Sequence, residues 1–190
     1  MLDFYTENSE FNKKDYSVNF LKKGEYNNCV FLNCDFSNSD LSDVNFTECK
    51  FETCNFSMAK IQNVIFADAI FENCKLTGLS FNDCNQFIIS FSFKKCNLDF
   101  CSFYKLNIKS TNFIKCSLKE ADFVETNLTS SLFNNCNLKR SIFENAILEK
   151  TDFRTSYNFS INPEINIIKG AKFSINNVVG LLDKYRIIIE

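Results

Sequence analysis

A repeat of five residues constrains the fold of this chain more than any other feature of its sequence. An apolar residue stands at every fifth position from Phe11 to Phe81 and, after a phase shift of two residues, from Phe93 to Phe153. All 28 of these positions are apolar, although apolar residues make up 45% of the chain. The chance of such a run is on the order of 10⁻¹⁰ before the choice of phase is allowed for, so the fold must impose the repeat.

Each repeat has a second position with a fixed character, two residues before the apolar centre. This position mostly holds small residues, and all ten cysteines of the chain fall in its phase, nine of them before an apolar centre and Cys84 before Gln86. The other three positions hold almost every charge and most of the asparagines. A period of five fits neither an α-helix nor a flat strand. It fits a chain that turns a corner every five residues, so that four units close a square coil and successive coils lie about 4.8 Å apart.

The pattern A/C/S-x-F/L-x-x over residues 11–153 resembles the pentapeptide-repeat family. The resemblance implies an all-β fold, a right-handed quadrilateral parallel β-helix in which the centre and the small residue point inward. We expect one domain over residues 1–190. Its parts are a first run of repeats (11–81), a phase break (82–92), a second run (93–153), an irregular last coil (154–173) and a C-terminal cap (174–190). Because the break adds two residues to the phase, we expect a bulge there rather than a long loop.

The C-terminal segment predicts a short helical cap over the open end of the solenoid. We expect a helix from Ser174 to Tyr185 with Ser174 as its N-cap, followed by a final strand at 186–189. The segment is more apolar than a cap requires, so these residues either cover the last coil or join a second chain, and the family resemblance favours a dimer. The cap and dimer candidates are Val178, Val179, Leu181, Leu182, Ile187, Ile188 and Ile189.

The sequence offers no motif for catalysis or for a cofactor. It has no histidine, no C-x-x-C motif and no glycine-rich phosphate loop. We therefore expect no enzyme activity, no metal and no cofactor, and we interpret the cysteines as buried filler in a reducing compartment. The N-terminus has no apolar signal region, and the uncharged stretch Cys84–Phe93 is too short to cross a bilayer. We expect a cytoplasmic protein that binds neither membrane nor nucleic acid directly.

Two further segments, FSFKKCNL at 91–98 and INPEIN at 161–166, resemble the McbG/Qnr/MfpA group of topoisomerase-protecting proteins within the family. The resemblance implies a protein that protects DNA gyrase or topoisomerase IV against quinolones or microcin, with an acidic surface that imitates DNA. The alternative is a structural or scaffold module for another protein partner.

The charges test the DNA-mimic hypothesis. Residues 1–91 have a net charge of −6 and residues 92–190 a net charge of +4. Duplex DNA carries one charge per about 1.7 Å, or nearly three per coil, so a mimic along the whole length is not supported. One acidic side in the first half remains possible, and its candidates are Asp35, Asp40, Asp43, Glu48, Glu52, Asp68, Glu72 and Asp83.

Overall fold

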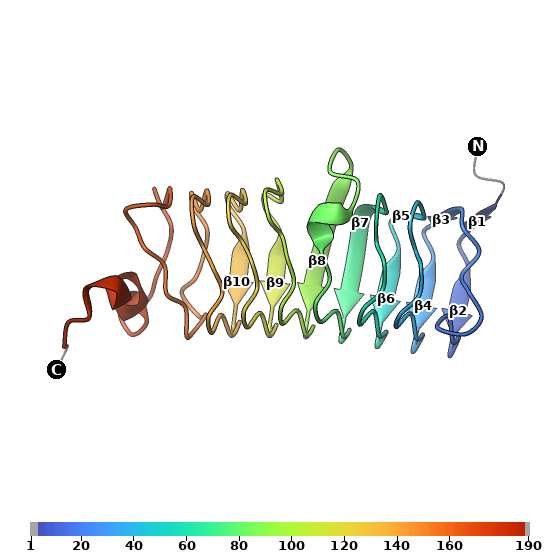
Figure 1. Cartoon of the computed structure of the whole chain (residues 1–190), viewed down its shortest axis with the longest axis horizontal. Helices are drawn as coiled ribbons and strands as arrows, with labels where there is room; N and C mark the ends of the chain where they lie inside the picture. Colours follow the sequence, from blue (N-terminus) through green and yellow to red (C-terminus); the bar gives the residue numbers. More distant parts are fainter. Residues whose placement is uncertain (1–3, 189–190) are drawn as a thin grey trace.

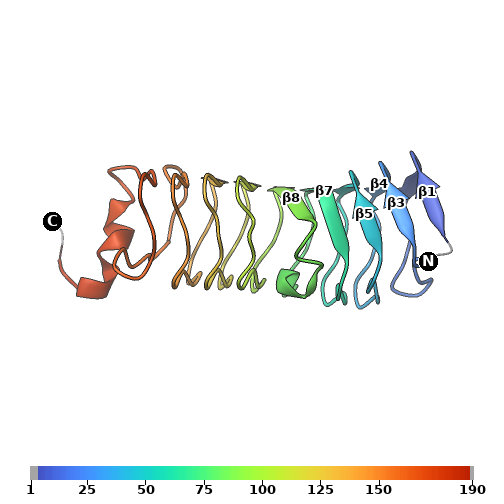
Figure 2. The same ribbon diagram turned by 90° about the horizontal axis from the view of Figure 1, so that it is seen from above.

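The computed structural model of the chain describes residues 4–188. The chain winds into one elongated solenoid, with its two termini at opposite ends (Figures 1 and 2). Its strands, all paired in parallel, are β1 (Tyr5–Glu7), β2 (Glu10–Asn12), β3 (Glu25–Asn27), β4 (Val30–Leu32), β5 (Asn45–Thr47), β6 (Lys50–Glu52), β7 (Ile65–Glu72), β8 (Ile89–Lys94), β9 (Asn112–Ile114) and β10 (Leu132–Asn134). The predicted all-β class, a right-handed quadrilateral parallel β-helix, is confirmed.

The register of the strands follows the repeat. Phe31 pairs with Phe51, 20 residues later, whereas Phe71 pairs with Phe93 across the phase break. We number the four faces by their inward columns. Face 1 contains Phe31, Phe51, Phe71, Phe93 and Phe113; face 2 contains Phe36, Phe56, Leu76 and Leu98; face 3 contains Leu41, Ile61, Phe81 and Phe103; face 4 contains Tyr26, Phe46, Phe66, Ile108 and Leu128.

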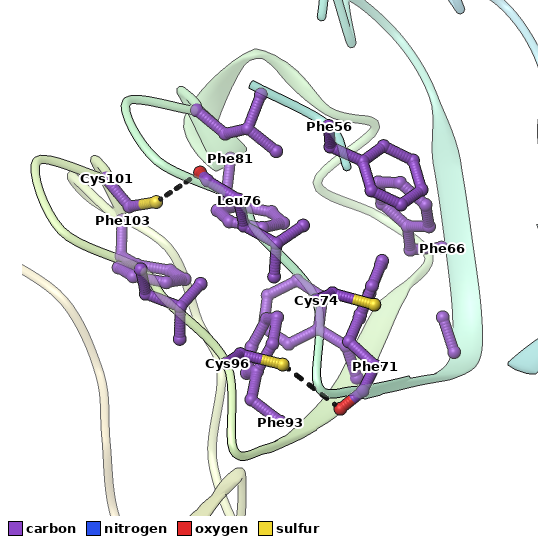
Figure 3. Packing of buried hydrophobic residues seen from close by; sticks show 14 of the residues in the cluster. Phe56, Phe66, Phe71, Cys74, Leu76, Phe81, Phe93, Cys96, Cys101 and Phe103 are labelled. Atoms are coloured by element: carbon purple, nitrogen blue, oxygen red, sulfur yellow. Dashed lines mark hydrogen bonds between the residues drawn. The ribbon is translucent and has the colours of Figure 1, made fainter. Parts of the chain in front are cut away.

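Aromatic columns and cysteines fill the interior. The Phe113 ring is fully buried and stacks on Phe93 and Phe133, with centroid distances of 5.3 and 4.7 Å. All ten cysteines are buried and unbridged. Eight of the thiols donate to main-chain carbonyls of the preceding coil, as Cys96 does to Phe71 O at 3.3 Å (Figure 3). Cys116 donates to Ile114 O within its own coil. The cysteines therefore act as small packed residues, and in these nine the single donor is satisfied.

The corners have a conformation that the sequence reasoning did not anticipate. The residue two places after most of the centres has a positive φ, 46° at Asn28 and 64° at Asp43, for example. Asparagine tolerates this left-handed conformation better than most residues, which explains why asparagine recurs at this position. Thr53, Met58 and Phe100 occupy the same conformation with less suitable side chains.

The phase break is larger than the expected bulge. A 3₁₀ turn, η1 (Phe81–Asp83), leads into a loop that projects from the wall before β8 begins at Ile89 (Figure 1). Phe87 in this loop is 99% exposed. Beyond the loop, Phe91 occupies a position that is small in most repeats, and its ring packs on Phe81 and Phe93 at 5.3 and 4.9 Å.

The predicted helix at the C-terminus is wrong in type. The segment forms two short 3₁₀ turns, η2 (Val178–Leu181) and η3 (Asp183–Tyr185). Asparagine and glycine favour helix poorly, and the Asn177 side chain instead donates to the carbonyls of Phe153, Arg154 and Ser156 at 2.9, 3.3 and 2.9 Å.

Two details of the cap are also corrected. Ser174 does not cap a helix through its side chain; its main-chain N–H donates to Asn177 Oδ1 at 2.9 Å. Residues 186–188 form no strand, and Ile189 lies outside the described residues. Gly180 lies so close to the last coil that an added Cβ would meet Phe159 O at 2.4 Å. Close contact through glycine and asparagine, rather than an apolar helix face, therefore fixes the cap.

Candidate functional site

The eight predicted acidic residues lie on all four faces of the solenoid. Asp35 is on face 2 and Asp40 on face 3, where they form bridges with Asn55 and Lys60 respectively. Glu52 and Glu72 pair with each other in the ladder of face 1. The other four, Asp43, Glu48, Asp68 and Asp83, lie at the two corners that flank face 4 and have positive or turn backbone angles. The structure therefore brings half of the predicted set together.

Basic partners neutralise most of the candidates that lie elsewhere. Lys94 Nζ lies 2.8 Å from Glu72, and Lys50 Nζ lies 2.8 Å from Glu52. The hydrogen bond from Lys94 lowers the pKa of the Glu72 carboxyl. Asp40 receives hydrogen bonds from Ser42, and these, with Lys23 at 3.6 Å, lower its pKa. These carboxylates belong to local networks and add little net negative potential.

Face 4 of the first half carries acidic residues without basic ones. The outward residues of β1, β3, β5 and the start of β7, with the corners that follow them, contain four acids and no lysine or arginine. The preceding corner contributes two more acids, and it also carries Lys22 and Lys23 just before β3. We call the surface formed by the six acids the acidic side: Glu7, Glu25, Asp43, Glu48, Asp68 and Asp83. All six are exposed. Within residues 4–188 none of them forms an ion pair, so their charges are not neutralised by neighbouring side chains.

Sequence reasoning missed Glu7 and Glu25. The signal was available, because Glu25 precedes the centre Tyr26 and so shares a face with the residues around Phe46 and Phe66. Assigning each outward acidic residue to one of the four faces would have selected Glu25. Glu7 precedes the first apolar centre, Phe11, and only the pairing of β1 with β3 places it on face 4.

The projecting loop, residues 84–88, adds an apolar tip beside the acidic side. It leaves the solenoid after Asp83 and returns at Ile89, which pairs with Phe66 on face 4. Phe87 is 99% and Ile88 52% exposed. The loop therefore places two apolar side chains at the C-terminal end of a negatively charged surface.

The predicted cap residues remain largely uncovered in the single chain. Leu181 packs against the core, and Leu182 is half-buried. Ile188 is 88% exposed, and Val178, Val179 and Ile187 are also exposed. Ile175, which the sequence reasoning did not select, is 90% exposed. The last coil therefore covers a minority of this apolar segment.

Residues 4–188 contain neither a metal-binding cluster of side chains nor a membrane-spanning helix. No group of three or more histidine, cysteine, aspartate or glutamate side chains is arranged to hold a metal ion there. None of the helical segments in that range has the length and apolar character needed to cross a membrane.

Comparison with known families identifies the class of the protein. The family model "Pentapeptide repeats (9 copies)" matches residues 36–85, and the model "Pentapeptide repeat region" matches residues 86–157. Together they cover more than half of the chain. The chain belongs to the pentapeptide-repeat family.

Solved structures of this family share the fold along almost the whole chain. A trypsin-treated variant of QnrB1, described as a plasmid-mediated fluoroquinolone resistance protein, matches with a TM-score of 0.63 and 18% identity over 95% of this chain and 98% of its own. HetL, described as involved in heterocyst differentiation regulation in the cyanobacterium Nostoc sp. strain PCC 7120, matches with a TM-score of 0.68 and 12% identity, covering 89% of this chain and 86% of its own. No curated protein matches the sequence. At these identities the similarity establishes the fold.

Proposed function

We propose that this protein is a non-enzymatic interaction solenoid that protects DNA gyrase or topoisomerase IV by placing its acidic side on their DNA-binding surface. The observation that carries the proposal is the row of unpaired carboxylates on face 4. The resemblance to the topoisomerase-protecting group and the fold shared with the fluoroquinolone resistance protein QnrB1 support it. A partner of this kind implies action in the cytoplasm.

The density of charge on the acidic side is close to that of one DNA strand. Its six carboxylates lie in five successive coils, or about 24 Å at about 4.8 Å per coil. This is one charge per about 4 Å, compared with one per about 3.4 Å along each strand of duplex DNA. We therefore propose that the acidic side imitates one DNA strand over a short length. Such a surface does not require the whole chain to carry a high negative charge.

The projecting loop gives the proposed interface an apolar anchor. Charge complementarity mainly accelerates association and aligns the partners, whereas buried aromatic side chains contribute much of the affinity. Phe87 has no packing role that would otherwise explain its position. We therefore expect Phe87→Ala to weaken binding to the topoisomerase without changing the stability of the fold.

We also propose that the C-terminal segment joins two chains. The exposed residues Ile175, Val178, Val179, Ile187 and Ile188 form an apolar end of the rod, and a two-fold contact would bury this end in both protomers. Sedimentation should show a species of about 44 kDa at micromolar concentration, twice the 22.0 kDa of the chain. A single species of 22 kDa would exclude a stable dimer.

A gyrase supercoiling assay tests the proposed function. The purified protein is added with and without a fluoroquinolone or microcin B17, and we expect a few micromolar to restore supercoiling. The variant E25K/E48K/D68K, which reverses three charges on the acidic side, should lose this effect. The control E120K/E144K/E149K makes the same change in net charge in the second half and should retain it.

The second candidate function is a scaffold for a different protein. Residues 92–190 have a net charge of +4 and no row of acidic residues. This half of the chain therefore favours a partner whose surface is complementary in charge. If neither rescue nor inhibition of gyrase or topoisomerase IV occurs at any concentration, the protection proposal fails and the scaffold function stands.

A further inference from the structure

One rung of the hydrogen-bonded ladder is missing on face 4, immediately after the phase break. In most coils the residue before a centre donates its main-chain N–H to the coil below, as Asn127 does to Leu106 O at 2.8 Å and Ile147 to Thr126 O at 3.0 Å on face 4. Asn107 occupies the equivalent position one coil earlier. Among the described residues, its N–H has no main-chain acceptor.

The carbonyls of the same segment are also left open toward the break. In the next coil, Asn127 O accepts from Ile108 N and Thr129 O from Ser110 N, at 3.0 and 2.9 Å. The equivalent carbonyls of Asn107 and Lys109 receive no main-chain donor from residues 4–188. Asn107 and Ile108, with the turn at 109–110 that follows them, therefore present a short unpaired edge, although their other edge is paired with the following coil.

The phase break explains the missing rung. The projecting loop replaces the face 4 segment of this coil, and the chain returns to the wall at Ile89, against β7. Its pairing there is irregular, because the register shifts between Phe66–Ile89 and Ala69–Phe91. Ser90 is drawn toward the coil below, where its hydroxyl donates to Asp68 Oδ1 at 2.8 Å. Regular pairing with the coil above resumes at Phe93 and Phe113.

A cavity of about 350 Å³ lies beside the open edge. Its apolar walls are Ile70, Ile89, Phe91 and Ile108, and its rims carry opposite charges. Asp68 stands on the rim that borders the acidic side, and Lys109 on the rim of the open edge. Lys109 is exposed and makes no ion pair with residues 4–188.

We propose that this open rung binds an extended peptide segment of a partner protein by β-strand addition. Unpaired N–H and C=O groups at strand spacing require an extended main chain as their complement. Side chains of a strand alternate, so an aliphatic residue enters the cavity while its neighbour faces outward. Lys109 selects a carboxylate at that outward position. This peptide site is separate from the acidic side except for Asp68, which lies on the rim of the cavity.

Hydrogen exchange of the free protein tests the open rung itself. We expect the amide of Asn107 to exchange at least 100-fold faster than that of Asn127, which is hydrogen-bonded within a regular rung. Equal protection of the two amides would mean that the rung is closed and would overturn the proposal.

A peptide titration followed by NMR tests the occupant. The probe is acetyl-Thr-Val-Glu-Val-Thr-amide, added up to about 5 mM, and we expect saturable shifts of the amides of residues 89–92 and 107–110. Lys109→Glu should weaken this peptide about fivefold and improve binding of the version with lysine in place of glutamate. Asn107→Pro removes an N–H that has no partner among residues 4–188, so it should abolish the shifts.

The stability of the variants separates binding from folding. The Asn107→Pro and wild-type proteins should have the same midpoint of urea unfolding. If Asn107→Pro unfolds, Lys109→Glu with the two peptides still decides the question. Absence of shifts at residues 107–110, or the same affinity of Lys109→Glu for both peptides, would refute the peptide site. Because these experiments use purified protein and peptide, their failure is distinguishable from failure of gyrase protection.

Discussion

Replacing a phenylalanine with alanine should reduce stability strongly where the ring points into the solenoid and weakly where it points outward. Phe113 is fully buried in the middle of face 1. Besides its two stacked neighbours, it makes edge contacts with Phe103 and Phe123, at 5.9 and 6.1 Å. Phe100 lies one coil earlier at a corner, where it is 57% exposed and has a φ of 62°.

The expected magnitudes differ by several kcal/mol. Phe→Ala at a buried site lowers the free energy of unfolding by about 3–5 kcal/mol. Because the Phe113 ring stacks on two others, we expect a loss of about 4 kcal/mol for Phe113→Ala. Phe100→Ala removes the same atoms from a solvated corner and should change the free energy of unfolding by less than about 0.5 kcal/mol. With a urea slope of about 2 kcal/mol/M, the Phe113→Ala midpoint should fall by about 2 M.

Urea unfolding followed by circular dichroism and by tyrosine fluorescence measures both variants. A solenoid derives its stability from coils and from the contacts between neighbouring coils, so weakening one central contact should also broaden the transition of Phe113→Ala. Equal effects of the two truncations, or a loss below about 1 kcal/mol for Phe113→Ala, would refute the assignment of inward and outward positions.

Three further predictions concern the corner, the thiols and the cap. Thr53→Asn should raise the free energy of unfolding by about 0.5–1 kcal/mol, since a β-branched residue at φ 57° is replaced by one that tolerates that conformation; a decrease in a urea titration would contradict this. Burial raises the pKa of the Cys49 and Cys101 thiols to about 12, so they stay neutral in the fold while unfolded thiols ionise near pH 9. This contribution to stability is therefore fully present below pH 9 and is lost as the pH rises toward 12, and the fall in urea midpoint between pH 8 and 10.5 should be smaller in Cys101→Ala. Gly180→Ala should loosen the cap, because its Cβ would meet Phe159 O, and hydrogen exchange should then accelerate in residues 174–185 while the central coils keep their protection.

The repeat predicted the interior of the fold well, because two inward positions in five are enough to define the core. Cys96 and Phe113, for example, lie where the periodicity places them. The irregular segments depend on interactions that periodicity does not encode. Phe91 fills a position that is small in most repeats because the projecting loop alters the coil, and Asn177 organises the cap by binding carbonyls of the last coil.

The acidic side was half predicted. Counting acids selected Glu48 and Asp68 but also Glu52, which pairs with Lys50 of the same strand, and Glu72, which pairs with Lys94 of the next coil. Lys94 is adjacent to Glu72 in the ladder although distant from it in sequence, so this neutralisation appears once each charge is assigned to its face. The missing rung at Asn107 could not be predicted, since it depends on the path of the loop.

Competition between this protein and duplex DNA for gyrase tests the central claim most directly. A fluorescently labelled duplex is bound to gyrase, and its anisotropy is followed as the protein is added at constant ionic strength. The account predicts that the wild-type protein displaces the duplex and that E25K/E48K/D68K does not, while E120K/E144K/E149K behaves as wild type. A ternary complex that retains the duplex, or displacement that is unchanged by reversal of the acidic side, would contradict it.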